Sequence, residues 1–100
     1  MNNISTVSQI TAADVADYLR IGEATTSDTN TLNTLLTVAK AYITQYTGRT
    51  LADLDEFQDI IIVVLILCQD MWDNRTLYVD NANMNKVVES ILDLHSVNLL

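Results

Sequence analysis

Proline is absent from this sequence of 100 residues, and only two glycines occur, Gly22 and Gly48. Folds built from many short strands usually need frequent turns that contain glycine or proline, so this scarcity argues against them. The apolar content of 49% is too high for a disordered protein. We therefore expect an all-α protein, a small bundle of about four helices that forms a single domain over residues 1–100.

Cysteine and histidine occur once each, as Cys68 and His95. A single cysteine excludes an internal disulfide, and the apolar residues around it predict a buried, unreactive thiol. A single histidine near a predicted helix end gives no recognisable zinc site and favours a charge–dipole role over catalysis. The sequence also lacks a phosphate loop, a nucleophile elbow and a dinucleotide-binding fingerprint. We expect no catalytic residue, no cofactor and no metal site, and hence no enzyme.

Basic residues are also few, because 5 of them stand against 13 acidic residues and the formal net charge is −8. A surface of this charge repels phosphate, so we expect no specific binding to nucleic acid. Acidic side chains promote solubility, and they also let a surface lie near DNA without binding it. Composition does not decide between these explanations. The acidic residues between Asp53 and Asp59 lack the glycine and spacing of a calcium loop and predict a helix start.

The first ten residues, MNNISTVSQI, contain no basic region followed by an apolar stretch. This pattern predicts no signal peptide and a cytosolic protein. Residues 1–9 are expected to be flexible. The longest apolar run, Ile60 to Cys68, has nine residues, whereas a membrane span needs about 20. We therefore expect no association with a membrane.

The same apolar run is predicted to form the centre of one continuous helix over residues 53–75. Apolar residues recur at helical spacing through the run and on both sides of it, which a short buried strand would not explain. Ile62, Val63 and Ile66 nevertheless fall on the polar side of this helix. Either another helix of the chain covers them, or they form a contact between subunits. These three residues are the candidate subunit interface.

Helical periodicity predicts three further helices, over residues 12–20, 31–47 and 84–94. The segment from Thr11 to Asp14 has the form of a capping box for the first of them. Gly48 is suited to the left-handed conformation that often ends a helix, here the second.

The segments between these helices are predicted to be irregular. Glu23 to Asn30 is polar and rich in Thr, Ser and Asp, which predicts a linker. Residues 76–83 are predicted to be a loop with a short extended piece at 77–79, and Asn83 is a candidate cap for the last helix. Residues 96–100 are predicted to be a C-terminal tail.

Several motifs follow one another in a characteristic order over residues 8–76. The first comprises Ile10-Thr11, Val15 and Tyr18-Leu19-Arg20-Ile21. The second comprises Leu35-Leu36, Ala39, Tyr42-Ile43 and Tyr46-Thr47-Gly48-Arg49-Thr50. The third is Met71-Trp72-Asp73-Asn74-Arg75. In order and spacing they resemble the small helical head–tail connector (adaptor) proteins of tailed bacteriophages and prophages, although the proline common before the family's third helix is missing and residues after 76 match poorly.

This resemblance implies a structural virion protein. Such proteins assemble as a ring between the portal of the head and the tail, and the genome passes through the central channel. The expected partners are further copies of this chain, the portal and tail-side phage proteins, and the expected location is the virion after synthesis in the host cytoplasm. The tail residues, or the loop from Thr76 to Asn83, could reach a neighbouring copy or the portal. Arg49 and Arg75, near two predicted helix ends, would pair with carboxylates of the same or an adjacent chain, or bind helix carbonyls.

A second hypothesis rests on the charge alone. It describes an acidic helical protein-binding module, such as a DNA mimic or an inhibitor of a basic partner. This hypothesis predicts tight one-to-one capture of a basic protein without oligomers, whereas a connector is expected to bind copies of itself.

Overall fold

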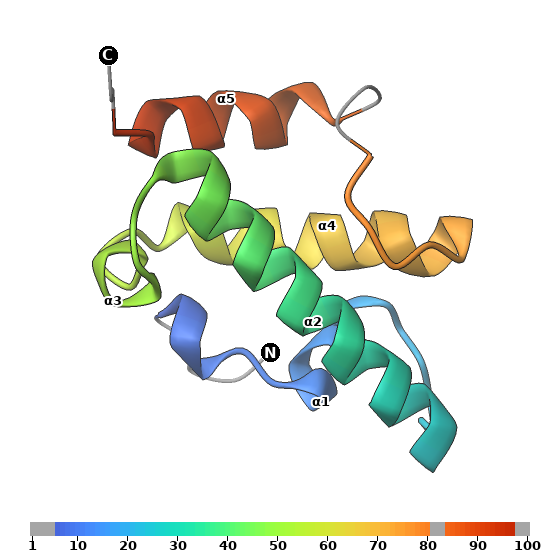
Figure 1. The fold of residues 1–100 in the computed structure, drawn as a ribbon. Helices are drawn as coiled ribbons and strands as arrows, with labels where there is room; N and C mark the ends of the chain where they lie inside the picture. Colours follow the sequence, from blue (N-terminus) through green and yellow to red (C-terminus); the bar gives the residue numbers. More distant parts are fainter. Residues whose placement is uncertain (1–5, 81–83, 98–100) are drawn as a thin grey trace.

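Helices form every regular element of the computed structural model, which describes residues 6–80 and 84–97 (Figure 1). The described part of the chain contains no strand, so the predicted all-α fold is confirmed. In chain order the elements are the 3-10 helix η1 (Val7–Gln9) and the α-helices α1 (Ala12–Tyr18), α2 (Thr26–Thr47), α3 (Leu51–Leu54), α4 (Asp59–Asn74) and α5 (Lys86–His95).

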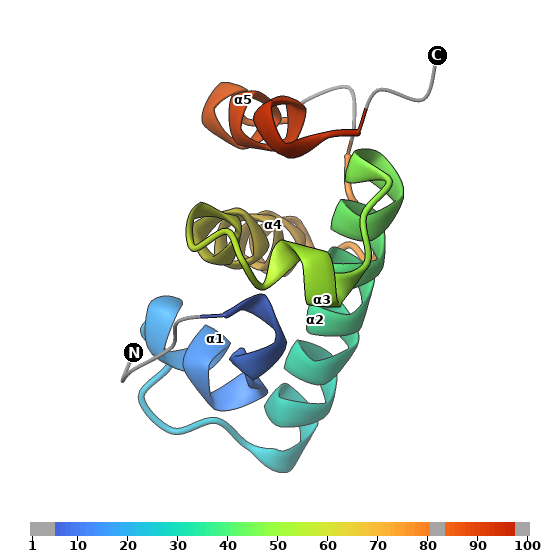
Figure 2. The same cartoon turned by 90° about the vertical axis from the view of Figure 1, so that its left-hand side faces the viewer.

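Helix α4 lies at the centre of the molecule, and the other helices pack around it (Figure 2). Helices η1 and α1 cover one side of α4 and α5 covers another, while α2 runs along all of these layers. Because α4 has neighbours on three sides, its central run is apolar almost all the way round. Its buried residues are Ile60, Ile61, Val63, Val64, Leu65, Leu67, Cys68 and Met71.

Helix α2 carries the apolar stripe that the sequence predicts, but it begins earlier than predicted. The linker predicted up to Asn30 is wrong from Thr26 onward, where the chain is already helical. Asp28 donates its amide to Thr25 Oγ1 at 3.0 Å, and Thr25 donates its amide to Asp28 Oδ2 at 3.1 Å. This capping box stabilises a first turn that buries no side chain, which is why hydrophobic periodicity does not reveal it.

The single helix predicted over residues 53–75 is wrong, because the chain forms α3, turns over residues 55–58 and only then forms α4. Leu54 and Ile60 are both fully buried. A continuous helix would place two side chains with this separation about 120° apart around its axis, so they would face different sides. The turn allows both to reach the core, and it brings Phe57 against the ring of His95.

Helices α1 and α4 end in the same backbone motif, with an arginine where glycine is usual. Arg20 has a φ of 61° and Arg75 a φ of 56°, both in the left-handed region. In each case the next amide donates to the carbonyl five residues earlier, at 3.0 Å, which is the bond of a Schellman motif. A residue other than glycine pays roughly 1 kcal/mol for this conformation. Helix α1 therefore ends at Tyr18 rather than at the predicted residue 20.

The start of the described chain belongs to the core. Val7 is fully buried, and Asp55 Oδ1 accepts hydrogen bonds from the amide and the hydroxyl of Ser8, at 2.9 and 2.8 Å. The flexibility predicted for residues 1–9 is therefore wrong for residues 6–9, and residues 1–5 lie outside the described part.

Helix α5 begins at Lys86, later than the predicted residue 84. Asn85 caps it, because its Oδ1 accepts the amide of Val87 at 2.8 Å; the predicted cap Asn83 lies outside the described residues. After α5, the amide of Val97 donates to the carbonyl of Thr47 at 2.8 Å. Val97, in the predicted C-terminal tail, is therefore bound to the end of α2, and residues 98–100 lie outside the described part of the chain.

Candidate functional site

Large apolar side chains are exposed at two opposite ends of the molecule. Leu94 and Val97, at the end of α5, are 74% and 39% exposed and together are termed the end patch. Leu77 and Tyr78, in the segment after α4, are 59% and 63% exposed and are termed the loop patch. Because α5 ends beside the start of α4, the two patches lie at opposite ends of that 16-residue helix, which is about 24 Å long (Figure 1).

The three residues predicted as a subunit interface do not form one exposed patch. Ile62 is 37% exposed, Ile66 is half-buried against the core, and Val63 is fully buried. Val63 lies one turn after Asp59 on the same side of α4, and His95 of α5 binds Asp59 there. The intramolecular explanation therefore holds for Val63, whose assignment to an outer patch is wrong, and Ile62 remains an exposed member of the set.

A hollow of about 260 Å³ lies beside the loop patch, between the end of α4 and the first half of α2, and is termed the apolar hollow. Its lining is formed by Thr31, Leu35, Met71, Trp72, Arg75, Thr76 and Leu77. The guanidinium carbon of Arg75 lies 5.5 Å from the centroid of the Trp72 ring, and the Arg75 side chain is exposed. An apolar surface with a cation at its rim suits an apolar side chain that has a carboxylate beside it.

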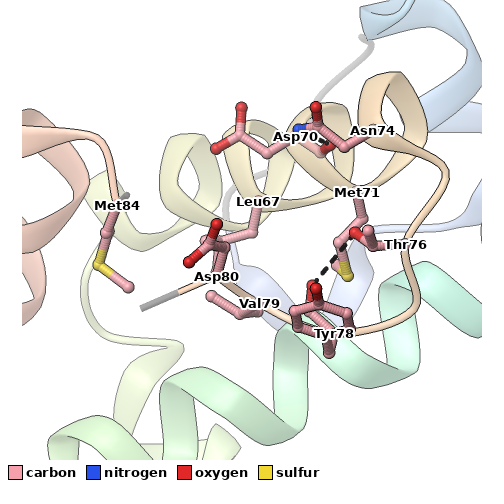
Figure 3. Close-up of a pocket in the computed structure, with 9 residues that line it drawn as sticks. All are labelled: Leu67, Asp70, Met71, Asn74, Thr76, Tyr78, Val79, Asp80 and Met84. Atoms are coloured by element: carbon pink, nitrogen blue, oxygen red, sulfur yellow. Dashed lines mark hydrogen bonds between the residues drawn. The ribbon is translucent and has the colours of Figure 1, made fainter. Parts of the chain in front are cut away.

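A second hollow, of about 340 Å³, lies where the segment after α4 folds back along that helix, and is termed the acidic hollow (Figure 3). Its lining is formed by Leu67, Asp70, Met71, Asn74, Thr76, Tyr78, Val79, Asp80 and Met84. Burial raises the pKa of the Asp70 carboxyl, and the charge of Asp73 raises it further. Nowhere in residues 6–80 and 84–97 do three side chains of metal-ligating type come together.

The last turn of α5 is fastened to the rest of the molecule by contacts between distant residues. His95 Nε2 lies 2.8 Å from Asp59 Oδ1, and its ring stacks on Phe57 with the centroids 4.1 Å apart. The hydroxyl of Tyr46 donates to Asp93 Oδ1 at 2.6 Å, and this bond is the main cause that raises the pKa of Tyr46 to about 12. These contacts hold the end patch in a fixed position.

The two arginines singled out in the sequence have different surroundings. Arg49 Nε donates to the backbone carbonyl of His95 at 2.6 Å, and its guanidinium carbon lies 5.3 Å from the centroid of Phe57. Arg49 therefore binds a carbonyl at the end of α5, which is one of its two predicted roles. Arg75 ends α4 and stays exposed at the rim of the apolar hollow.

The loop patch lies in the loop from Thr76 to Asn83, and Val97 lies in the C-terminal tail, the two segments expected to reach a neighbouring copy or the portal, whereas the exposure of Leu94 was not predicted. For α5 a signal exists, because Val87, Ile91 and Leu94 recur at helical spacing beside a separate stripe of Val88 and Leu92. Only the second stripe is fully buried, and Val87 of the first stripe is 59% exposed. Two neighbouring apolar stripes on one helix indicate more apolar surface than one core needs. The loop patch has no such signal, because it lies outside any regular element.

Comparisons with protein-family models, with curated proteins and with solved structures find no match for this chain. The central motif of the family resemblance forms the turn between α2 and α3. Gly48 has a φ of 71° and ends α2, and Thr50 caps α3 by accepting the amide of Asp53 at 3.2 Å. Each described helix is too short or too polar to cross a bilayer.

Proposed function

We propose that this chain is a structural subunit that binds copies of itself and forms a ring, in the manner of the head–tail connectors that it resembles. The observation that carries the proposal is the exposure of large apolar side chains at both ends of one helical body. Contiguous apolar surface on a folded protein marks contact sites. Two different contact sites on one subunit lead to head-to-tail assembly, which forms a ring when the rotation closes.

The charge of the molecule supports a role beside passing DNA. The net charge is −8, and Lys40 Nζ and Arg49 Nε donate to backbone carbonyls of the chain itself, at 3.3 and 2.6 Å. A channel wall with 13 acidic against 5 basic residues does not retain phosphate, so the genome can move past it. In this role the partners are further copies, the portal and tail-side proteins, and the protein resides in the virion without catalytic activity.

The proposal is tested by measuring the mass of the purified protein at increasing concentration, by size-exclusion chromatography with light scattering. We expect a defined oligomer at high concentration or on addition of a portal protein. A strict monomer under both conditions contradicts the proposal. An independent check is the gene neighbourhood, where portal, capsid and tail genes are expected.

A second candidate function is supported by the acidic hollow. Asp70 of α4 and Asp80 of the following segment both line it, together with apolar side chains. This combination accepts the stem and the charged head of a lysine or arginine from a basic partner. Light scattering separates the two functions, because a binding module gives a one-to-one complex with a basic protein and no ring.

A further inference from the structure

We infer that neighbouring subunits meet head to tail, with the end patch of one copy seated in the apolar hollow of the next copy. This inference rests on the self-association proposed above and names the two surfaces that meet. The occupant of the hollow is a second copy of this chain, because the two surfaces complement each other in shape, in polarity and in charge.

The complementarity of shape and polarity is that one surface projects and the other recedes. Leu94 is 74% exposed on a helix end that its neighbours hold in place. The apolar hollow, of about 260 Å³, is lined by Leu35 and Met71, which are almost fully buried, so its accessible apolar surface comes from Trp72 and Leu77. An aliphatic side chain that enters such a hollow removes apolar surface from water on both partners, which is the main favourable term in association.

The complementarity of charge opposes the repulsion between copies, each of which carries −8. Asp93 precedes Leu94 and is exposed, so the end patch has a carboxylate beside it. Arg75 is exposed at the rim of the apolar hollow. When Leu94 of one copy enters the hollow of the next, Asp93 of the first copy comes close to Arg75 of the second. Such pairs of opposite charge fix the orientation of two partners.

The backbone of Arg75 provides a matched pair of variants for the test. It holds a left-handed φ of 56°, which glycine adopts without strain. The fold therefore keeps a guanidinium at this position at a conformational cost. Arg20 has the same backbone conformation at the end of α1 but is not part of the hollow's lining, which makes it a matched control.

The position of the two surfaces determines the type of assembly. They are different surfaces and lie at opposite ends of α4, so one contact leaves a free end patch on one copy and a free hollow on the other. Copies therefore add in one direction until the ring closes. A two-fold dimer, in which identical patches meet, would stop at two copies.

The test uses two full-length variants, Leu94→Asp and Leu77→Asp, each of which removes one of the two surfaces. Both side chains are mostly exposed, so we expect both variants to keep the helical circular dichroism and the melting temperature of the wild type. Each variant alone should remain monomeric in native mass spectrometry. Their equimolar mixture should give a dimer and nothing larger, because only one functional contact can form between them.

Three further variants serve as controls. Val87→Asp changes a side chain as exposed as Leu77 but outside both surfaces, so it should assemble like the wild type. Arg75→Gly should weaken assembly by about tenfold, as expected for the loss of an interfacial charge. Arg20→Gly should leave assembly unchanged.

The outcomes separate the inference from the proposed function. A wild type that stays monomeric both at high concentration and on addition of a portal protein contradicts both. A wild type that assembles, together with Leu94→Asp and Leu77→Asp variants that assemble equally well, leaves the function standing and overturns the inference. A mixture of the two variants that stays monomeric also overturns it. If Leu77→Asp loses its helical spectrum, Arg75→Gly decides the question for the hollow.

Discussion

The start of α4 is held by side chains from three other parts of the chain, whereas its end is bordered by two hollows. At the start, Asp59 binds His95, and the ring of Phe57 contacts both the ring of His95 and the guanidinium of Arg49. At the end, Leu77 and Tyr78 are largely exposed and Arg75 takes a left-handed backbone. The fold thus fixes one end firmly and leaves apolar surface uncovered at the other.

This difference shows how one small core supports both stability and contact. The side chains that bind the last turn of α5, among them Phe57 and Asp59, make their contacts within the chain. Substitutions of these residues should therefore lower the stability of the monomer. The residues around the loop patch contribute little to the fold, so substitutions there should be tolerated by the monomer.

The largest effect is expected for Val63→Asp at the held end. Val63 is fully buried, and an unpaired carboxylate at such a position lowers the free energy of unfolding by about 3–5 kcal/mol. Ile62→Asp, one residue earlier but exposed, should change it by less than about 1 kcal/mol. Urea unfolding followed by circular dichroism measures both. Equal effects of the two substitutions would contradict the difference in burial between Val63 and Ile62.

An intermediate effect is expected when the last turn of α5 is released. His95→Ala removes the ring stacked on Phe57 and the bond to Asp59, which should lower the free energy of unfolding by about 1–2 kcal/mol. Tyr78→Ala, at the other end of α4, should stay within about 0.5 kcal/mol of the wild type. The same urea titrations apply, and a larger loss for Tyr78→Ala would reverse the comparison between the two ends.

A smaller effect, of opposite sign, is expected at the helix ends. Arg75→Gly and Arg20→Gly each replace a side chain held at positive φ, so each should raise the free energy of unfolding by up to about 1 kcal/mol. Thermal unfolding of the monomer at low concentration measures the gain. A loss of stability in Arg75→Gly alone would mean that its stacking on Trp72 outweighs the backbone strain.

The smallest effect is a dependence of stability on pH that arises from Tyr46. Its hydrogen bond to Asp93 raises the pKa of the phenol from 10.0 to about 12 in the folded protein. The neutral phenol is therefore favoured by folding, so its contribution is complete below pH 10 and is lost as the pH rises towards about 12. The difference in unfolding free energy between wild type and Tyr46→Phe should shrink over this interval. A constant difference would exclude the hydrogen bond as its source.

The stripes of α2 and α4 are visible in the sequence because burial imposes a period of 3.6 residues on them. The start of α2 does not show this period, because residues 26–30 bury no side chain. Its signal is the pair of Thr25 and Asp28, which repeats the spacing of Thr11 and Asp14 that predicts α1. At the starts of α1 and α2, the capping-box pattern therefore predicts the first helical residue better than hydrophobic periodicity does.

The break before α4 and the burial of Val63 depend on contacts far along the chain. The pattern of apolar residues continues through the break, and only the need to bury both Leu54 and Ile60 requires a turn there. Val63 is fully buried one turn after Asp59, whose partner His95 lies 36 residues further along the chain. Periodicity within one helix carries no information about such a neighbour, so the predicted interface could not be corrected from the sequence.

Helix α4 is continuous from Asp59 to Asn74, so the two proposed contact surfaces are joined by a stiff rod without a hinge. The angle between successive subunits would then follow from how α5 rests on this rod and from the reversal of the chain at Arg75. The curvature of an assembled ring, and with it the width of its opening, would be determined within each folded subunit before two of them meet.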